Sequence, residues 1–203
     1  MLAETLPEED LVALVGSRLC HDLISPLGAI GNGVELLTMT TGTPSPELQL
    51  IAESVAAANS RIKFFRLAFG RSGEQRIGKP EIATLMTQFS QGNRLRIDWR
   101  AEGDFARQMV KLACLAVLCL EPAMPRGGEI TIDSDAPDGS GTWMIRGTTL
   151  RVKEDPSLWA NLDGMQSEVS PAQVQFALLP REARAMGRTL AWDIGETSVS
   201  ITY

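Results

Sequence analysis

The sequence predicts an α+β protein in which a helical N-terminal domain precedes a sandwich of helices and strands. Apolar residues recur at steps of three and four through roughly the first seventy residues, which is typical of helices. Beyond that point, short segments alternate polar and apolar residues as strands do, and Gly-rich turns separate them. We therefore expect a helical hairpin at residues 1–73 and an α/β sandwich at residues 74–203.

The first helix begins near the N-terminus. Thr5 and Glu8 have the spacing of a capping box, and Pro7 is tolerated in a first helical turn. One apolar stripe then follows the helix to about residue 39. Its members are Val12, Val15, Leu19, Leu23, Leu27, Ile30, Val34 and Leu37.

A second helix follows the break at residues 41–44. Ser45 supplies a cap, Pro46 suits the first helical position, and Gly70 marks the end. Its apolar residues have the spacing of a coiled-coil seam: Leu48, Ile51, Val55, Ala58, Ile62, Phe65 and Phe69. Two long helices with a short connection lie antiparallel. Because a lone hairpin exposes too much apolar surface, we expect two copies to form a four-helix bundle.

The second domain contains helices and strands in alternation. We expect its sheet to be largely antiparallel, with the helices packed on one face. Helices are predicted at residues 80–90, 110–120 and 171–186, and strands at 94–99, 129–132 and 142–146. Residues 138–141 form the turn between the last two of these strands, and a closing hairpin is predicted at 189–193 and 198–203 around Gly195.

Composition excludes several classes of function. A net charge of −6 argues against a nucleic-acid partner, since phosphate binding needs clustered Lys and Arg. No apolar run has the length of a membrane span, and the acidic start lacks the order of a secretion signal. Three cysteines fit buried thiols in a reducing compartment. We expect a cytoplasmic protein with no membrane association.

His21 is the only histidine in the chain. On a helical wheel it lies nearly opposite the apolar stripe, with Ser17 and Ser25 one turn away. An exposed, largely neutral imidazole can attack phosphorus, and small neighbours leave room for another protein. The alternative interpretation is a solvated surface histidine. A metal site is not expected, because no second histidine is present.

Asp22 follows the histidine directly and has two interpretations. It is either a helix-surface carboxylate or a catalytic partner that orients the imidazole, although adjacent helical residues do not face each other without a particular rotamer. Residues that share the histidine's face are expected to touch a protein partner: Leu14, Ser17, Arg18, Ser25, Gly28 and Asn32. Arg18 lies at the edge of that face and either meets an acidic pocket of the partner or only solvates the helix.

Four segments carry a resemblance to a known family. Residues 19–37, which read LCHDLISPLGAIGNGVELL, and residues 64–70, which read FFRLAFG, are the specific ones. Residues 125–128 and 182–187 extend the match across nearly the whole chain. In these segments the chain resembles the bacterial histidine phosphotransferases of the ChpT type.

The resemblance implies a homodimer built on a four-helix bundle, with a second domain related to the ATP-binding domain of histidine kinases. Proteins of this type shuttle phosphoryl groups from the receiver domain of a hybrid histidine kinase to those of response regulators, in relays linked to bacterial cell-cycle control. The resemblance makes His21 the phospho-accepting residue and Asp22 its neighbouring acid, with Asn32 at a polar position of the kinase helix. Mg²⁺ is then supplied by the partner receiver domain.

The second domain departs from the pattern of a working kinase. A kinase has asparagines on the helix before its Gly-Gly turn, whereas this chain has Leu115 and Cys119 there. Residues 146–150 stand where a kinase has Asp-x-Gly-x-Gly. We therefore expect no bound ATP, cofactor or metal. The alternatives are a non-catalytic scaffold that binds receivers and an autophosphorylating histidine kinase.

Overall fold

The computed structural model describes residues 8–41, 45–71, 73, 75–92, 94–164 and 169–203. The chain divides into two compact units, Met1–Arg71 and Ser72–Tyr203. The division lies two residues from the boundary expected from the sequence. Each unit is described by itself below.

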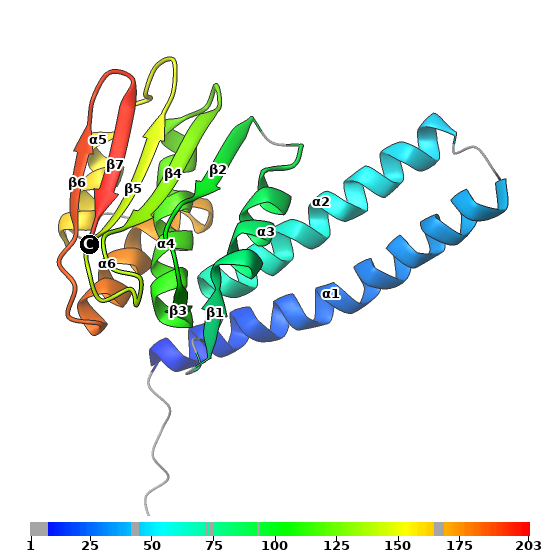
Figure 1. The fold of residues 1–203 in the computed structure, drawn as a ribbon, viewed down its shortest axis with the longest axis horizontal. Helices are drawn as coiled ribbons and strands as arrows, with labels where there is room; N and C mark the ends of the chain where they lie inside the picture. Colours follow the sequence, from blue (N-terminus) through cyan, green and yellow to red (C-terminus); the bar gives the residue numbers. More distant parts are fainter. Residues whose placement is uncertain (1–7, 42–44, 72, 74, 93, 165–168) are drawn as a thin grey trace, which may run out of the picture. The chain divides into compact units, whose positions relative to one another are not determined.

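The first unit is a hairpin of two helices, α1 (Glu8–Thr41) and α2 (Pro46–Phe69), which pack along each other in opposite directions (Figure 1). The predicted start of α2 is confirmed: the Ser45 hydroxyl accepts a hydrogen bond from the Leu48 amide at 3.3 Å. Gly70 ends the helix, as expected. The capping box predicted for the first helix begins at Thr5, outside the described residues.

Small residues let the two helices approach closely. A Cβ atom at Gly16 would lie 3.2 Å from the Phe69 carbonyl oxygen, and one at Gly31 would lie 3.5 Å from the Val55 side chain. Beside Gly16, the Ser17 hydroxyl accepts a hydrogen bond from the backbone N–H of Arg71 at 3.0 Å. This hydrogen bond therefore ties the chain just after α2 to the N-terminal part of α1.

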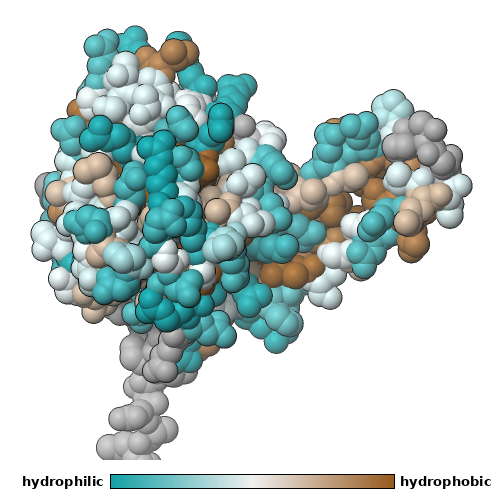
Figure 2. Space-filling view, in the orientation of Figure 1, coloured by the Kyte–Doolittle hydropathy of each residue, from teal (hydrophilic) through white to brown (hydrophobic). Residues whose placement is uncertain are grey.

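Much of the predicted apolar stripe stays uncovered in the single chain. Six of its members are at least half exposed: Val12, Val15, Leu19, Leu23, Ile30 and Leu37. Val34 is buried, and on α2 the seam residue Ile51 is also exposed. Brown, hydrophobic side chains are visible along the hairpin in Figure 2. The hairpin alone leaves a long apolar surface in contact with water.

The second unit is built on a five-stranded mixed sheet, ordered β2-β4-β5-β7-β6. β2 and β4 run parallel, and every other neighbouring pair is antiparallel. The strands of this sheet are β2 (Leu95–Trp99), β4 (Gly128–Ser134), β5 (Trp143–Thr148), β6 (Ala191–Ile194) and β7 (Ser198–Thr202). The helices α4 (Arg107–Leu120) and α6 (Gln175–Ala185) pack together on one face of it (Figure 1).

The remaining elements are short, apart from α3, and the sequence did not predict most of them. They are β1 (Arg76–Gly78), α3 (Lys79–Ser90), β3 (Asp104–Ala106), η1 (Glu121–Ala123), α5 (Pro156–Trp159), η2 (Ala160–Asp163) and η3 (Pro171–Gln173). Of these, α3 was expected, and η3 lies within the helix expected at residues 171–186. β1 and β3 pair with each other in a separate ribbon. The helix expected from residue 171 starts as η3, and α6 begins at Gln175.

The core of the second unit lies between α4 and the sheet. Every α4 side chain from Met109 to Leu120 is buried. Trp143 on β5 contacts three other aromatic rings, those of Trp99, Phe105 and Tyr203, at centroid distances of 4.9–6.2 Å. Such contacts add to the stabilisation from apolar burial. The apolar run of α4 therefore belongs to the core.

The turn before β4 requires glycine. Gly127 has φ of +83° and Gly128 has φ of +146°. A Cβ at Gly127 would lie 2.2 Å from the Arg94 carbonyl oxygen, and one at Gly128 would lie 2.1 Å from that of Thr148. Backbone geometry alone explains this glycine pair.

We predict that Gly127→Ala destabilises the second unit by about 2–4 kcal/mol, because left-handed strain of about 1–3 kcal/mol adds to the clash with Arg94. The measurement is urea unfolding followed by tryptophan fluorescence, since all four tryptophans (Trp99, Trp143, Trp159 and Trp192) belong to this unit. Gly187→Ala is the matched control, because Gly187 has φ of +67° and open space around it. Equal losses in both variants would contradict the argument from close approach.

Candidate functional site

His21 lies in the middle of α1, and 78% of its side chain is exposed. The exposure expected from the helical wheel is therefore present. Ser25, one turn further along, is also exposed. The imidazole is open to an approaching protein, as a group that exchanges phosphoryl groups with a partner must be.

Asp22 turns its carboxylate toward the imidazole. The Nδ1 atom of His21 lies 3.2 Å from Oδ1 of Asp22. An ionised carboxylate only accepts hydrogen bonds, so Nδ1 carries the proton in this contact. The lone pair of the neutral ring then belongs to Nε2, the nitrogen that faces away from Asp22. Of the two sequence interpretations of Asp22, this contact supports the one in which it orients the ring.

Arg18 contacts the other oxygen of the same carboxylate. Its Nε donates a hydrogen bond to Oδ2 of Asp22 at 2.7 Å, across one helical turn. Hydrogen bonds from His21, the larger contribution, and from Arg18 lower the pKa of Asp22 below its usual value. Asp22 is therefore ionised at neutral pH, and its two oxygens accept hydrogen bonds from Arg18 and His21 at the same time.

The other residues predicted to touch a partner lie on or beside this face. Ser25, Asn32 and Arg18 are exposed, whereas Leu14 and Gly28 are half-buried. A Cβ at Gly28 would have no neighbour within 4 Å, so the surface there is open. Ser17 is half-buried and its hydroxyl is engaged by Arg71. Their contact with a partner stays a prediction.

Cys20 precedes the histidine, but its chemistry differs. The side chain is half-buried, and burial raises the pKa of its thiol above the usual value, although Arg66 acts in the opposite direction. The nucleophilic form of cysteine is the thiolate, which a raised pKa disfavours. Of these two neighbours, the exposed imidazole is the better nucleophile.

In the described part of the chain, no cluster of three or more His, Cys, Asp or Glu side chains has an arrangement that would hold a metal ion. None of the helices described is long and apolar enough to cross a membrane.

α4 is the helix on which the resemblance to histidine kinases leads one to look for asparagines. Leu115 and Cys119, at the positions the sequence singled out, have no exposed surface. Neither side chain offers an oxygen to a metal ion or a phosphate. Burial raises the pKa of the Cys119 thiol well above its usual value, so it also has no thiolate to offer.

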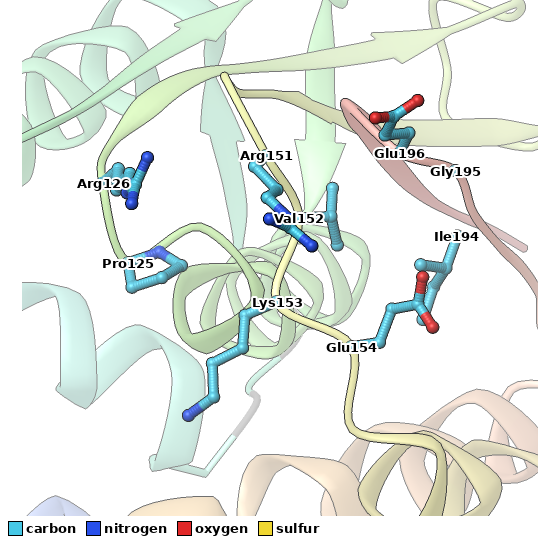
Figure 3. A pocket seen from close by; sticks show the side chains of 9 residues that line it. All are labelled: Pro125, Arg126, Arg151, Val152, Lys153, Glu154, Ile194, Gly195 and Glu196. Atoms are coloured by element: carbon cyan, nitrogen blue, oxygen red, sulfur yellow. The ribbon is translucent and has the colours of Figure 1, made fainter.

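A cavity of about 610 Å³ opens in the second unit (Figure 3). No site residue predicted from the sequence lies in it. Its lining consists of Pro125, Arg126, Arg151, Val152, Lys153, Glu154, Ile194, Gly195 and Glu196. Backbone hydrogen bonds join the three segments: the Lys153 amide donates to the Ala123 carbonyl, and the Val152 amide donates to the Glu196 carbonyl. Charges of both signs line the cavity.

Comparisons with known proteins point to one family. Residues 79–198 match the family described as "Histidine phosphotransferase C-terminal domain". Over 156 residues the chain is 35% identical to "Protein phosphotransferase ChpT" of Brucella abortus (strain 2308), which covers 74% of each protein. A solved structure titled "1.7 Angstrom Structure of a Bacterial Phosphotransferase" superposes with a TM-score of 0.70 at 27% identity, over 100% of this chain and 99% of that one.

The match of a family model to more than half of the chain and the identity to a curated relative lead to the same assignment. The resemblance first carried by residues 19–37 and 64–70 is confirmed. The chain is a protein phosphotransferase, and it belongs to the ChpT-type histidine phosphotransferases of two-component phosphorelays.

Proposed function

We propose that this chain relays phosphoryl groups between the aspartates of receiver domains through a phosphohistidine at His21, without binding ATP. The observation that carries the proposal is the exposed imidazole held by Asp22 through Nδ1, which leaves Nε2 with a lone pair facing solvent. The donor is the receiver of a hybrid histidine kinase and the acceptors are response regulators. We place the relay in the cytoplasm.

The transfer needs no proton to move. Nε2 of the neutral ring attacks the phosphorus of a receiver's aspartyl phosphate, the N–P bond forms, and the O–P bond breaks as the aspartate leaves with its electron pair. Nδ1 keeps its proton throughout, and the Asp22 carboxylate offsets the positive charge that develops on the ring. The reverse step passes the group to the next aspartate. Mg²⁺ comes from the receiver, so this chain contributes position and charge.

The face around His21 is the proposed docking surface. Ser25 and Gly28 are small, and the surface above Gly28 is open, so a receiver can bring its aspartate close to the ring. Leu14, Ser17, Arg18 and Asn32 flank this opening and complete the predicted contacts. Relay contacts of this kind are small and transient, so we expect the imidazole to matter more than any single docking residue.

The uncovered apolar stripe of α1 supports a homodimer. Two hairpins that place these stripes together would form a four-helix bundle and remove the exposed leucines, valines and isoleucine from water. The occupant is a second copy of this chain, because the stripe repeats at the spacing of a self-complementary helical seam.

The absence of ATP binding rests on α4. A nucleotide with Mg²⁺ needs oxygen ligands at the positions where Leu115 and Cys119 lie, and both side chains are buried in the core. Residues 146–150 also lack the Asp-x-Gly-x-Gly order of the kinases. We assign the second unit a role in supporting the hairpin or contacting partners.

The first prediction from the proposed function concerns the nucleophile, His21. Incubation with a ³²P-labelled receiver should transfer acid-labile label to the wild-type chain, and His21→Ala should take up none, because the attacking nitrogen is gone. Cys20→Ser is the control: it changes the neighbouring nucleophile and should keep the label. Persistent labelling of His21→Ala would end the proposal. A wild-type chain that binds the receiver but stays unlabelled would favour the scaffold.

The second prediction concerns assembly. Sedimentation at micromolar concentration should give twice the mass of the 22.0 kDa chain. The double variant Ile30→Glu, Leu37→Glu should be monomeric, because it places charges in the apolar seam. Leu150→Glu, at a leucine of the second unit that is 83% exposed, should stay dimeric. A monomeric wild-type chain would count heavily against the bundle.

The third prediction concerns nucleotide. Calorimetric titration of the wild-type chain with a non-hydrolysable ATP analogue and Mg²⁺ should give no saturable heat up to about millimolar ligand, the weak end of ordinary affinities. Tight, magnesium-dependent binding would overturn this part of the proposal and favour an autophosphorylating kinase.

A further inference from the structure

We propose that Arg18 is a positioning residue for phosphoryl transfer, acting on His21 through Asp22. It does so by fixing which nitrogen of the imidazole carries the proton. The inference rests on the proposed function for its consequence, but its physical core, the tautomer of a single ring, can be measured without any transfer.

The two oxygens of Asp22 are divided between two partners. Oδ2 accepts from Nε of Arg18 at 2.7 Å, and Oδ1 lies 3.2 Å from Nδ1 of His21. Residues 18 and 22 are four apart and share a face of the helix, so their contact is natural. Residues 21 and 22 are adjacent and project in different directions, so their contact requires a particular Asp22 rotamer.

Arg18 selects that rotamer. The side chain of Asp22 is about half exposed, so water competes with His21 for its carboxylate. With Oδ2 held by the guanidinium, the carboxylate is aligned along the helix and Oδ1 is presented to the ring. Without Arg18, the carboxylate is free to turn to solvent, and the contact with His21 is lost for part of the time.

The contact with Asp22 determines whether Nε2 of His21 can act as a nucleophile. A neutral imidazole carries its proton on Nδ1 or on Nε2, and only the first form has a lone pair on Nε2. Asp22 stabilises the first form by accepting from Nδ1. The rate of attack is proportional to the population of the competent form. Arg18 therefore raises the rate without touching the phosphoryl group.

This role differs from the one the sequence offered. The sequence alone leaves two roles for Arg18: it either meets the acidic pocket of a receiver or only solvates the helix. Nε of Arg18 is already occupied within the chain, and its side chain is 77% exposed. A docking role predicts weaker receiver binding when Arg18 is replaced, whereas positioning predicts a change in the free protein.

The experiment uses the fact that His21 is the only histidine. In a chain labelled with ¹⁵N in the imidazole, the two ring nitrogens give one pair of resonances, measured near pH 8.5, about two units above the pKa of a free imidazole. We expect Nδ1 of the wild type at the position of a protonated nitrogen and Nε2 at that of an unprotonated one. In Arg18→Gln the two shifts should move toward each other, and Asp22→Asn should move them further.

Two further variants sharpen the result. Arg100→Gln is the matched control, because it removes a similarly exposed Arg–Asp ion pair, also 2.7 Å long, from the second unit. It should leave both shifts unchanged. Arg18→Lys keeps the charge but not the Nε–H group, so it should restore the wild-type shifts only in part.

Transfer kinetics give the second readout. At saturating phosphorylated receiver, Arg18→Gln should slow label uptake about two- to five-fold, the range expected for an exposed ion pair. Unchanged ¹⁵N shifts in Arg18→Gln would overturn the inference, whatever the kinetics, and a slower rate only below saturation would assign Arg18 to docking. A wild-type chain that takes up no label would overturn the proposed relay, while shifted resonances would still support the control of the tautomer.

Discussion

The helical period of α1 is the constraint on which the rest of the hairpin depends. With 3.6 residues per turn, one helix has to present three different surfaces along its length. Gly16 and Gly31 allow close contact with α2. The six exposed apolar residues between Val12 and Leu37 form a second surface, although Val34 of the same stripe is buried, and His21 occupies a third. Because side chains four apart share a face, the same period places Arg18 one turn before Asp22, where the two side chains can bond.

The architecture of the second unit rests on buried apolar side chains and on glycines in its turns. The sheet order, the buried helix α4 and the glycine turn before β4 are all determined by packing and backbone geometry. None of these features needs a polar side chain on α4. Leu115 and Cys119 have no exposed surface, so both side chains support the packing of the core.

Periodicity predicted the elements that are long or strongly alternating. The hairpin, α3, α4, β2 and the pairs β4–β5 and β6–β7 appear where the sequence indicated. The three-residue strands β1 and β3 were missed, because so short a segment has no measurable period. The start of α6 was misplaced by a few residues, since Pro171 and Ser170 signal a helical turn but do not distinguish η3 from a longer α-helix.

Only part of the candidate site could be predicted from the sequence. The exposure of His21 followed from its place opposite the apolar stripe. The bridge from Arg18 to Asp22 did not, because it depends on a rotamer, which no sequence pattern specifies. Likewise, no sequence pattern indicated that the Ser17 hydroxyl accepts a hydrogen bond from the Arg71 amide, because the two positions are 54 residues apart. The cavity beside Arg151 was missed because three separate segments form it.

The hydrogen bond between Ser17 and Arg71 has a consequence for motion. A serine hydroxyl accepts an amide at each end of α2: Ser45 at its start, and Ser17, from the neighbouring helix, just past its end. Helix termini ordinarily fray, which lets their amide protons exchange with water long before the middle of the helix does. Here the chain just after α2 is bonded to the segment of α1 that carries His21, the proposed phosphoacceptor, so local opening of one is coupled to loosening of the other.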